Sequence, residues 1–193
     1  MIKYPNGNNF LIKDTKSTKR HILTAANRGM GLEEDINTSN AFYIDQGIAL
    51  IHKRTTPIKV VKVNYDNGAK IVEAYFEKQS TTDYNGVYKG KYIDFEAKST
   101  KNENSFPLSN ISLHQIKHLE NVNKQKGITF FIIEFSSKNE IYLIDGSYII
   151  SFYYHGDRKS IPYEIIKQKG SLITQGITPR LDYIKIVEDK YFK

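Results

Sequence analysis

Hydrophobic and polar residues change their spacing several times along the chain, and each spacing predicts a type of element. Apolar residues recur at a helical period after Asn27, a residue type that often caps helices, and they predict a helix over about 30–45. The apolar run 47–52 then ends at a basic turn and Pro57. Such a run is typical of a buried strand.

Two β-rich arms flank Asp66-Asn67-Gly68, a sequence that favours a tight reversal. The pattern predicts a β-hairpin over 58–76. Polar residues such as Lys59 alternate within otherwise apolar arms. The hairpin therefore either protrudes from the body and carries charge, or forms part of an ordinary two-sided meander.

The alternation is cleanest in the strand that follows Tyr92. Side chains in a strand point to opposite faces with a period of two. One face therefore carries Tyr92, Asp94, Glu96 and Lys98, and the other carries Ile93, Phe95 and Ala97. Three charged groups line one face of this strand.

The second half of the chain adds further helices and strands. Ser112 and Gln115 fit a capping box, which places the start of a helix near Ser112. Segments 127–135 and 140–144 have high β-propensity, and a helix is expected around 162–169. Helices interleaved with strands predict an α/β fold with a central mixed sheet, and no internal repeat is visible.

Length and composition indicate one domain, 1–193, with room for one sizeable core. Its first part, 1–24, is polar and basic without apolar periodicity, and reads as a mobile basic arm or a solvated tail. No stretch approaches the roughly 18 apolar residues that cross a bilayer, and the N-terminus lacks the apolar core of a signal peptide. We therefore expect a cytoplasmic protein without a membrane partner.

Charge and cysteine content narrow the chemistry. The formal net charge is +7, which suits a surface that binds phosphates. The sequence contains 0 Cys, which excludes disulfides, thiolate catalysis and cysteine zinc sites. A metal would be held by oxygen or histidine ligands, so hard ions such as Mg²⁺ are the leading candidates.

The residues from Asp83 to Lys98 carry the most informative chemistry. If Asp83 and Glu96 lie on adjacent strands joined through a turn over 86–90, their oxygens can converge on one Mg²⁺, and Lys98 can reach the scissile phosphate. That arrangement would hydrolyse phosphodiesters. The alternative is a surface strand with an ordinary Glu-x-Lys neighbour pair. Interleaved lysines and tyrosines over 84–101 favour contact with phosphates and bases.

A series of motifs occurs in the same order as in a known family. They are Asn27-Arg28-Gly29-Met30, Ile51-His52-Lys53, Glu73-Ala74-Tyr75-Phe76, Ser80-Thr81-Thr82-Asp83-Tyr84-Asn85-Gly86, Tyr92-Ile93-Asp94-Phe95-Glu96-Ala97-Lys98 and Pro179-Arg180-Leu181-Asp182-Tyr183. With them the chain resembles the RecU-type Holliday junction resolvases. The resemblance implies the restriction-endonuclease-like fold of the PD-(D/E)xK nucleases, with the hairpin as a protruding stalk.

The resemblance also implies roles for individual residues. It assigns magnesium ligation to Thr81, Asp83, Glu96 and Gln115, and makes Lys98 the stabiliser of the transition state; Asp83, Glu96 and Lys98 form the catalytic set. Thr81 could instead be an ordinary strand residue. Gln115 could be only the partner of the helix cap.

Four other polar residues have an ordinary and a functional interpretation. Glu33 could assist a metal-bound water, but an exposed helix carboxylate is the simpler interpretation. His114 and His118 have the spacing of a helical zinc pair, yet no third ligand follows, so a polar helix face is preferred. His52 precedes two basic residues and could contact phosphate or only solvent.

The sequence departs from the family pattern at two places. The hairpin tip 65–70 is shorter and less basic than the family's, and 53–57 replaces a double lysine followed by Pro-Thr-Pro. Both changes concern how closely the hairpin engages the junction centre or a recombinase, and leave the cleavage residues unchanged.

The sequence thus predicts a Mg²⁺-dependent, structure-selective endodeoxyribonuclease that resolves four-way DNA junctions by paired symmetric nicks in recombination and repair. Two like nicks require two sites, which a homodimer supplies. One alternative is a non-catalytic accessory that binds junctions and modulates a recombinase filament, but it would need no intact acid set. The other is a nuclease of similar fold that acts on other branched or duplex DNA.

Overall fold

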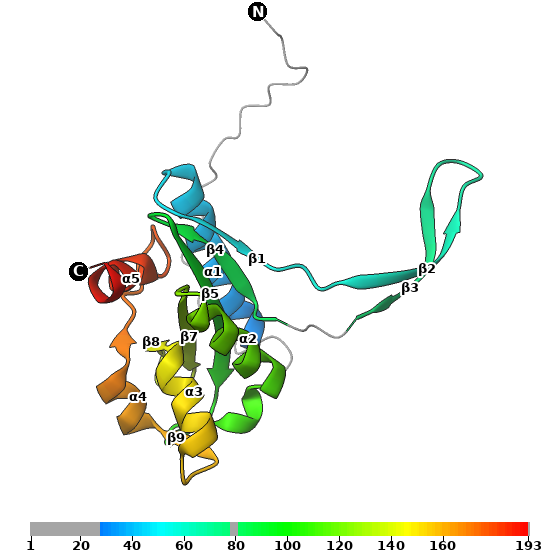
Figure 1. Ribbon diagram of the computed structural model, residues 1–193. Helices are drawn as coiled ribbons and strands as arrows, with labels where there is room; N and C mark the ends of the chain where they lie inside the picture. The colour runs from blue at the N-terminus through cyan, green and yellow to red at the C-terminus, as the bar shows by residue number, and fades with distance from the viewer. Residues whose placement is uncertain (1–27, 78–80, 193) are drawn as a thin grey trace, which may run out of the picture.

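The computed structural model describes residues 28–77 and 81–192 (Figure 1). The basic arm predicted over 1–24 lies outside these residues. Helices are interleaved with strands along the chain, as the sequence predicts. No helix within the described ranges is long and apolar enough to cross a membrane.

A six-stranded sheet forms the centre of the domain. Its strands, in spatial order, are β1 (Leu50–Lys53), β4 (Tyr84–Tyr88), β5 (Lys91–Thr100), β7 (Ile128–Phe135), β8 (Glu140–Asp145) and β10 (Ser171–Leu172). The β5–β7 pair is parallel and the other pairs are antiparallel. The predicted mixed sheet is therefore confirmed. A small separate pair joins β6 (Ser105–Pro107) to β9 (Ser160–Pro162), and a 3₁₀ turn, Leu108–Asn110, follows β6.

Helices cover both faces of the sheet. One face packs against α1 (Arg28–Asp45) and α5 (Tyr183–Tyr191), and the other against α2 (Leu113–Lys124), α3 (Gly146–His155) and α4 (Tyr163–Lys169). Successive residues of β7 serve the two cores, because Phe130 belongs to the first and Phe131 to the second. The predicted α/β fold, a central mixed sheet flanked by helices, is thus confirmed.

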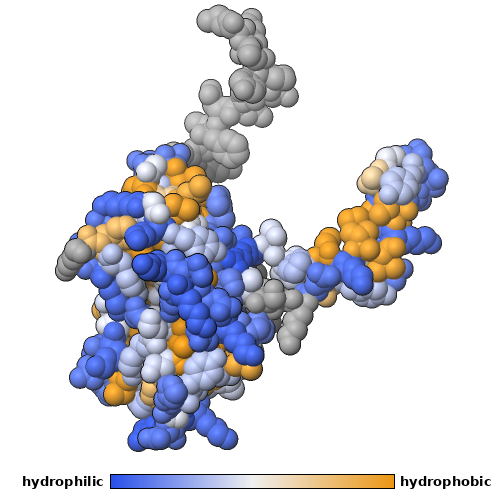
Figure 2. Space-filling view, viewed as in Figure 1, coloured by the Kyte–Doolittle hydropathy of each residue, from blue (hydrophilic) through white to orange (hydrophobic). Residues whose placement is uncertain are grey.

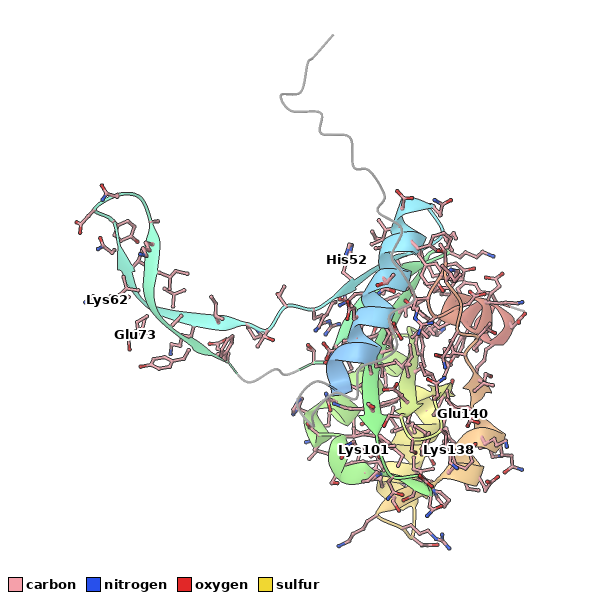
Figure 3. The ribbon with its side chains drawn as sticks, turned by 180° about the vertical axis from the view of Figure 1, so that it is seen from behind. His52, Lys62, Glu73, Lys101, Lys138 and Glu140 are labelled. Carbon is pink, nitrogen blue, oxygen red and sulfur yellow. The ribbon has the colours of Figure 1, made fainter. Side chains whose placement is uncertain are left out.

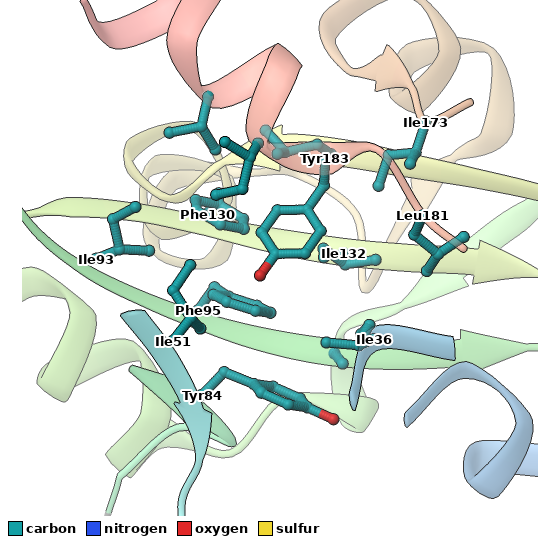
Figure 4. Packing of buried hydrophobic residues seen from close by; sticks show 14 of the residues in the cluster. Ile36, Ile51, Tyr84, Ile93, Phe95, Phe130, Ile132, Ile173, Leu181 and Tyr183 are labelled. Carbon is teal, nitrogen blue, oxygen red and sulfur yellow. The ribbon is translucent and has the colours of Figure 1, made fainter. Parts of the chain in front are cut away.

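Stacked aromatic rings hold β4, β5 and β7 together beneath α5. The ring of Phe95 lies 4.8 Å from that of Tyr84 and 4.6 Å from that of Phe130, and Tyr183 packs against the same column (Figure 4). All four side chains are fully buried. These stacked rings hold β4 and β5 in position, and the opposite face of β5 carries the charged residues Asp94, Glu96 and Lys98.

The turn between β4 and β5 is tighter than the sequence predicted. We expected a turn over 86–90, but Gly86 lies inside β4, and the reversal uses Lys89 and Gly90, both with positive φ. Gly86 is needed for a different reason. A Cβ there would lie 2.1 Å from the carbonyl oxygen of Leu50, so the glycine lets β1 approach β4.

The hairpin protrudes from the body as a two-stranded ribbon of β2 (Ile58–Asn64) and β3 (Lys70–Phe76) (Figure 1). This is the protruding one of the two predicted alternatives. Lys62 and Glu73 are paired across it (Figure 3), while apolar side chains cover much of its surface (Figure 2). Phe76, near its base, is 81% exposed.

Candidate active site

The two predicted acids meet where β4 begins opposite β5. Tyr84 pairs with Phe95, so the neighbouring Asp83 faces Glu96 on the side of the sheet that α2 covers. The Asp83 N–H donates to Oε2 of Glu96 at 3.2 Å, and the Ala97 N–H donates to Oδ2 of Asp83 at 3.4 Å. The structure therefore brings the two carboxyl groups together, which is the arrangement that the predicted metal site needs.

Glu96 is the buried centre of the site. Its Oε1 lies 2.7 Å from Nζ of Lys98 and accepts a hydrogen bond of 2.5 Å from Nε2 of Gln115. Its side chain has no exposed surface. Burial and the nearby Asp83 carboxylate raise the pKa of Glu96 to about 8, although Lys98 acts in the opposite direction.

This donor set suits a hard divalent cation. Asp83 and the buried Glu96 crowd two carboxyl groups together, and a bound cation would remove the cost of ionising both. Among the described residues, no group of three or more His, Asp and Glu is arranged to hold a metal. Two carboxylates with amide, hydroxyl or water oxygens match Mg²⁺, which keeps several waters when bound by proteins.

Gln115 and Thr81 are placed differently from the two acids. The Gln115 Oε1 accepts from the Ser112 N–H at 2.9 Å, so the predicted capping box is present at the start of α2. Its amide nitrogen faces Glu96, and metal ligation would require the amide to rotate. Thr81 is half-buried two positions before Asp83, and no hydrogen bond between described residues joins it to Asp83, Glu96 or Gln115.

Glu33, on α1, is paired with a lysine near the two acids. It forms an ion pair with Lys53 at the end of β1, and its carbonyl oxygen accepts from the Tyr84 hydroxyl at 3.3 Å. Burial and the charges of Glu33, Asp83 and Glu96 raise the pKa of Tyr84. Glu33 is thus a partner of a lysine beside the acid site. His52, one position earlier in β1, is exposed (Figure 3).

A second buried carboxylate, Asp94, organises a cluster that sequence analysis missed. Its Oδ2 accepts from Nη2 of Arg54 at 2.5 Å and from the Tyr92 hydroxyl at 2.8 Å, and it lies 2.9 Å from Nε2 of His118. Its Oδ1 accepts from the Thr82 hydroxyl. We call these five residues the Asp94 cluster.

The Asp94 cluster supports the acid site from one side. Thr82 precedes Asp83 in the chain, and the Arg54 N–H donates to the Asp83 carbonyl at 2.7 Å. Asp94 therefore ties β5, the end of β1 and the loop that carries Asp83 together. His118 serves this cluster, consistent with the polar helix face that we preferred to a zinc pair. The one feature of the sequence that could have pointed to this cluster is that Asp94 and Glu96 lie on the same face of β5.

Comparison with known proteins identifies a family. The family model described as "Recombination protein U" matches residues 27–189. The chain belongs to the RecU family. A RecU-family relative from Bacillus cytotoxicus, named "Holliday junction resolvase RecU", is 50% identical over 199 residues, with 99% of this chain and 98% of the relative covered.

A relative of the same name from Geobacillus kaustophilus is 48% identical over 196 residues, again with 99% and 98% of the two chains covered. The resemblance to RecU inferred from the motifs is thus confirmed. A solved structure of Archaeoglobus fulgidus Hjc, titled a Holliday junction resolvase, aligns with a TM-score of 0.44 and 8% identity over 74% of this chain and 94% of the other.

Proposed function

We propose that the protein is a Mg²⁺-dependent endodeoxyribonuclease that resolves Holliday junctions in recombination and repair. The observation that carries the proposal is the convergence of Asp83, Glu96 and Lys98 in a chain about half identical to resolvases along nearly its whole length. A non-catalytic accessory would have no need of a buried carboxylate beside a second acid and a lysine. The catalytic reading is therefore favoured.

Asp83 and Glu96 would hold the cation, with Thr81 and the carbonyl of Gln115 as further oxygen donors. A bound Mg²⁺ would polarise a phosphoryl oxygen and lower the pKa of a coordinated water. Lys98, whose ammonium lies 2.7 Å from Oε1 of Glu96, would stabilise the charge that develops on the phosphate. In the structure the Gln115 amide instead donates to Oε1 of Glu96, so its rotation toward the cation would exchange this hydrogen bond for a metal contact.

Resolution requires two nicks of like polarity at symmetric positions, and we infer a homodimer with one site in each protomer. The protruding hairpin supplies an element that can read the open shape of a crossover, whereas phosphate contacts supply affinity without sequence preference. Its exposed apolar surface also suits a protein partner such as a recombinase. The protein would act in the cytoplasm, where chromosomal DNA is present.

A cleavage assay tests the function directly. The wild-type chain should nick a mobile four-way junction in two strands with Mg²⁺, and should cleave neither linear duplex nor any substrate without the metal. Asp83→Asn should abolish nicking but still bind the junction, because it removes a ligand and adds no repulsion of DNA. Asp189→Asn, an exposed acid on α5, is the matched control and should cleave normally. Wild-type cleavage by Asp83→Asn would overturn the site assignment.

A further inference from the structure

A cavity of about 370 Å³ opens between the start of β5 and the end of α2. Its mostly apolar walls are formed by six residues: Tyr92, His118, Asn121, Val122, Gln125 and Gly127. Pockets for small ligands usually occupy about 300–1,000 Å³. This cavity is at the lower end of that range, which suits one planar heterocycle better than a larger ligand.

The cavity lies next to the acid site. Tyr92 and Glu96 share a face of β5 and are four residues apart, which corresponds to about 13 Å along a strand. On α2, His118 is about one turn beyond Gln115, the residue that contacts Glu96. A DNA strand cleaved at Glu96 would therefore reach the cavity within a few nucleotides.

Two exposed lysines adjoin one wall of the cavity. Lys124 and Lys126 flank Gln125 in the chain. The nearby Glu120 lies on the same helix as Lys124, and their charged groups are 3.3 Å apart. Lys124 is thus offset by Glu120, while Lys126 adds positive charge next to Gln125 that can attract the phosphates of a strand.

The walls match the chemistry of a nucleobase. The Tyr92 ring offers a stacking surface, and its hydroxyl is fixed by Asp94 at 2.8 Å, so the ring is held in place before any ligand binds. The amides of Asn121 and Gln125 can donate to and accept from a base edge. A Cβ at Gly127 would lie 2.6 Å from Cγ1 of Val122 and 3.4 Å from Cδ1 of Tyr92, so a larger residue there would crowd two walls of the cavity.

We propose that this cavity binds one unstacked nucleobase of the cleaved strand, a few nucleotides from the scissile phosphate. The proposal rests on the proposed function and adds a determinant of its selectivity. Extruding a base from a duplex costs a few kcal/mol, and less where the base is already unpaired or poorly stacked. A branch point supplies such bases, so the cavity would favour junctions over linear duplex and would place the cut relative to the branch.

The test combines protein variants with a scan of abasic sites. A set of junctions is prepared, each with a single abasic site at a different position around the cut. Cleavage of every junction is measured with the wild type, with Tyr92→Ala and with Asn121→Trp. The first variant removes the stacking ring together with its hydroxyl bond to Asp94, and the second fills the cavity from an exposed position while leaving all five residues of the Asp94 cluster unsubstituted. Tyr154→Ala, an exposed tyrosine on α3, is the matched control.

For the wild type, one abasic position should lower the cleavage rate about tenfold, within the range that base–aromatic stacking contributes. Tyr92→Ala and Asn121→Trp should lower cleavage of the intact junction by a similar factor and show no further loss at that position. Tyr154→Ala should behave like the wild type. A variant that is merely destabilised would lose activity by the same factor at every abasic position. If the loss caused by the variant and the loss caused by the abasic site multiply at the critical position, the ring and the base act independently and the proposal is overturned.

A fluorescent base separates binding from cleavage. With 2-aminopurine at the critical position, Asp83→Asn should change the emission on binding the junction in Mg²⁺, and the double variant with Asn121→Trp should not. If the wild type cleaves all the junctions at the same rate wherever the abasic site lies, the proposed base binding in the cavity is refuted and the nuclease function is not. If the wild type does not cleave the junction at all, the proposed nuclease function is refuted. A change of oligomeric state in Asn121→Trp would identify the cavity as a protein interface, which also overturns the proposal.

Discussion

Glu96→Gln should make the metal-free protein more stable at alkaline pH while abolishing cleavage. Glu96 is fully buried, and its carboxyl group lies beside Asp83. The pKa of Glu96 is raised from 4.5 to about 8, chiefly by burial and then by the Asp83 charge. The folded protein therefore holds this proton more tightly than the unfolded chain does.

The sign and size of the effect follow from linkage. Between pH 4.5 and about 8 the folded state binds more protons than the unfolded state, so the free energy of unfolding falls as the pH rises through this window. At about 1.4 kcal/mol per pH unit, the full loss is roughly 5 kcal/mol. The glutamine variant escapes this loss but also loses the ion pair with Lys98. Its net advantage at pH 8.5 should be about 2–4 kcal/mol.

Urea denaturation of both proteins in EDTA at several pH values measures the difference. The two curves should diverge as the pH rises from 5 to 8.5, and Mg²⁺ should stabilise only the wild type. Glu103→Gln, an exposed acid, serves as the control and should follow the wild type. A constant difference across the whole pH range would show that Glu96 is ionised in the fold without penalty, and would refute the crowded-carboxylate account.

Three further perturbations test other parts of the site. Lys98→Ala should slow junction cleavage by at least about 100-fold yet keep divalent-cation binding in calorimetry; persistent cleavage would leave Lys98 as only a partner of Glu96. Asp94→Asn should destabilise the fold by about 3 kcal/mol in urea, since Arg54 loses its buried partner; an unchanged midpoint would deny the Asp94 cluster a structural role. Replacing 59–75 with a short glycine-containing turn should lower the ratio of junction to duplex affinity at one fixed salt concentration. An unchanged ratio in a folded variant would place selectivity in the body.

Local patterns in the sequence were enough for most elements. The helix cap at Ser112 and the hairpin arms were predicted correctly, because capping and turn residues act over a few positions. Helices α3 and α5 were not predicted. In α3 aromatic and aliphatic residues surround the helix and hide its period, although Asp145 caps it by accepting from the Ser147 N–H. In α5 the buried residues Tyr183, Ile184 and Val187 carried a usable stripe.

The site was predictable only where its residues share a strand or a motif. Glu96 and Lys98 followed from alternation and Asp83 from its position across a short turn, whereas Thr81 and Gln115 were named as ligands only through the resemblance to RecU. The Asp94 cluster joins Asp94 to Arg54, 40 residues away, and to His118, 24 residues away. No local pattern links these residues, because the end of β1 and the helix α2 meet at Asp94 only in the folded sheet.

The attachment of the hairpin has a consequence for insertions and deletions. The chain leaves the body just after Arg54 and returns at Asp83, and these two residues are hydrogen-bonded. The tip, near Asp66-Asn67-Gly68, lies beyond the paired strands β2 and β3, so we expect length changes there to leave this hydrogen bond in place. An insertion within β1, or between Thr82 and the start of β4, would change the register of the residues that meet Asp94 and Glu96. Hairpin length can therefore vary among homologues without moving the acids, provided that the pairing of Arg54 with Asp83 is kept.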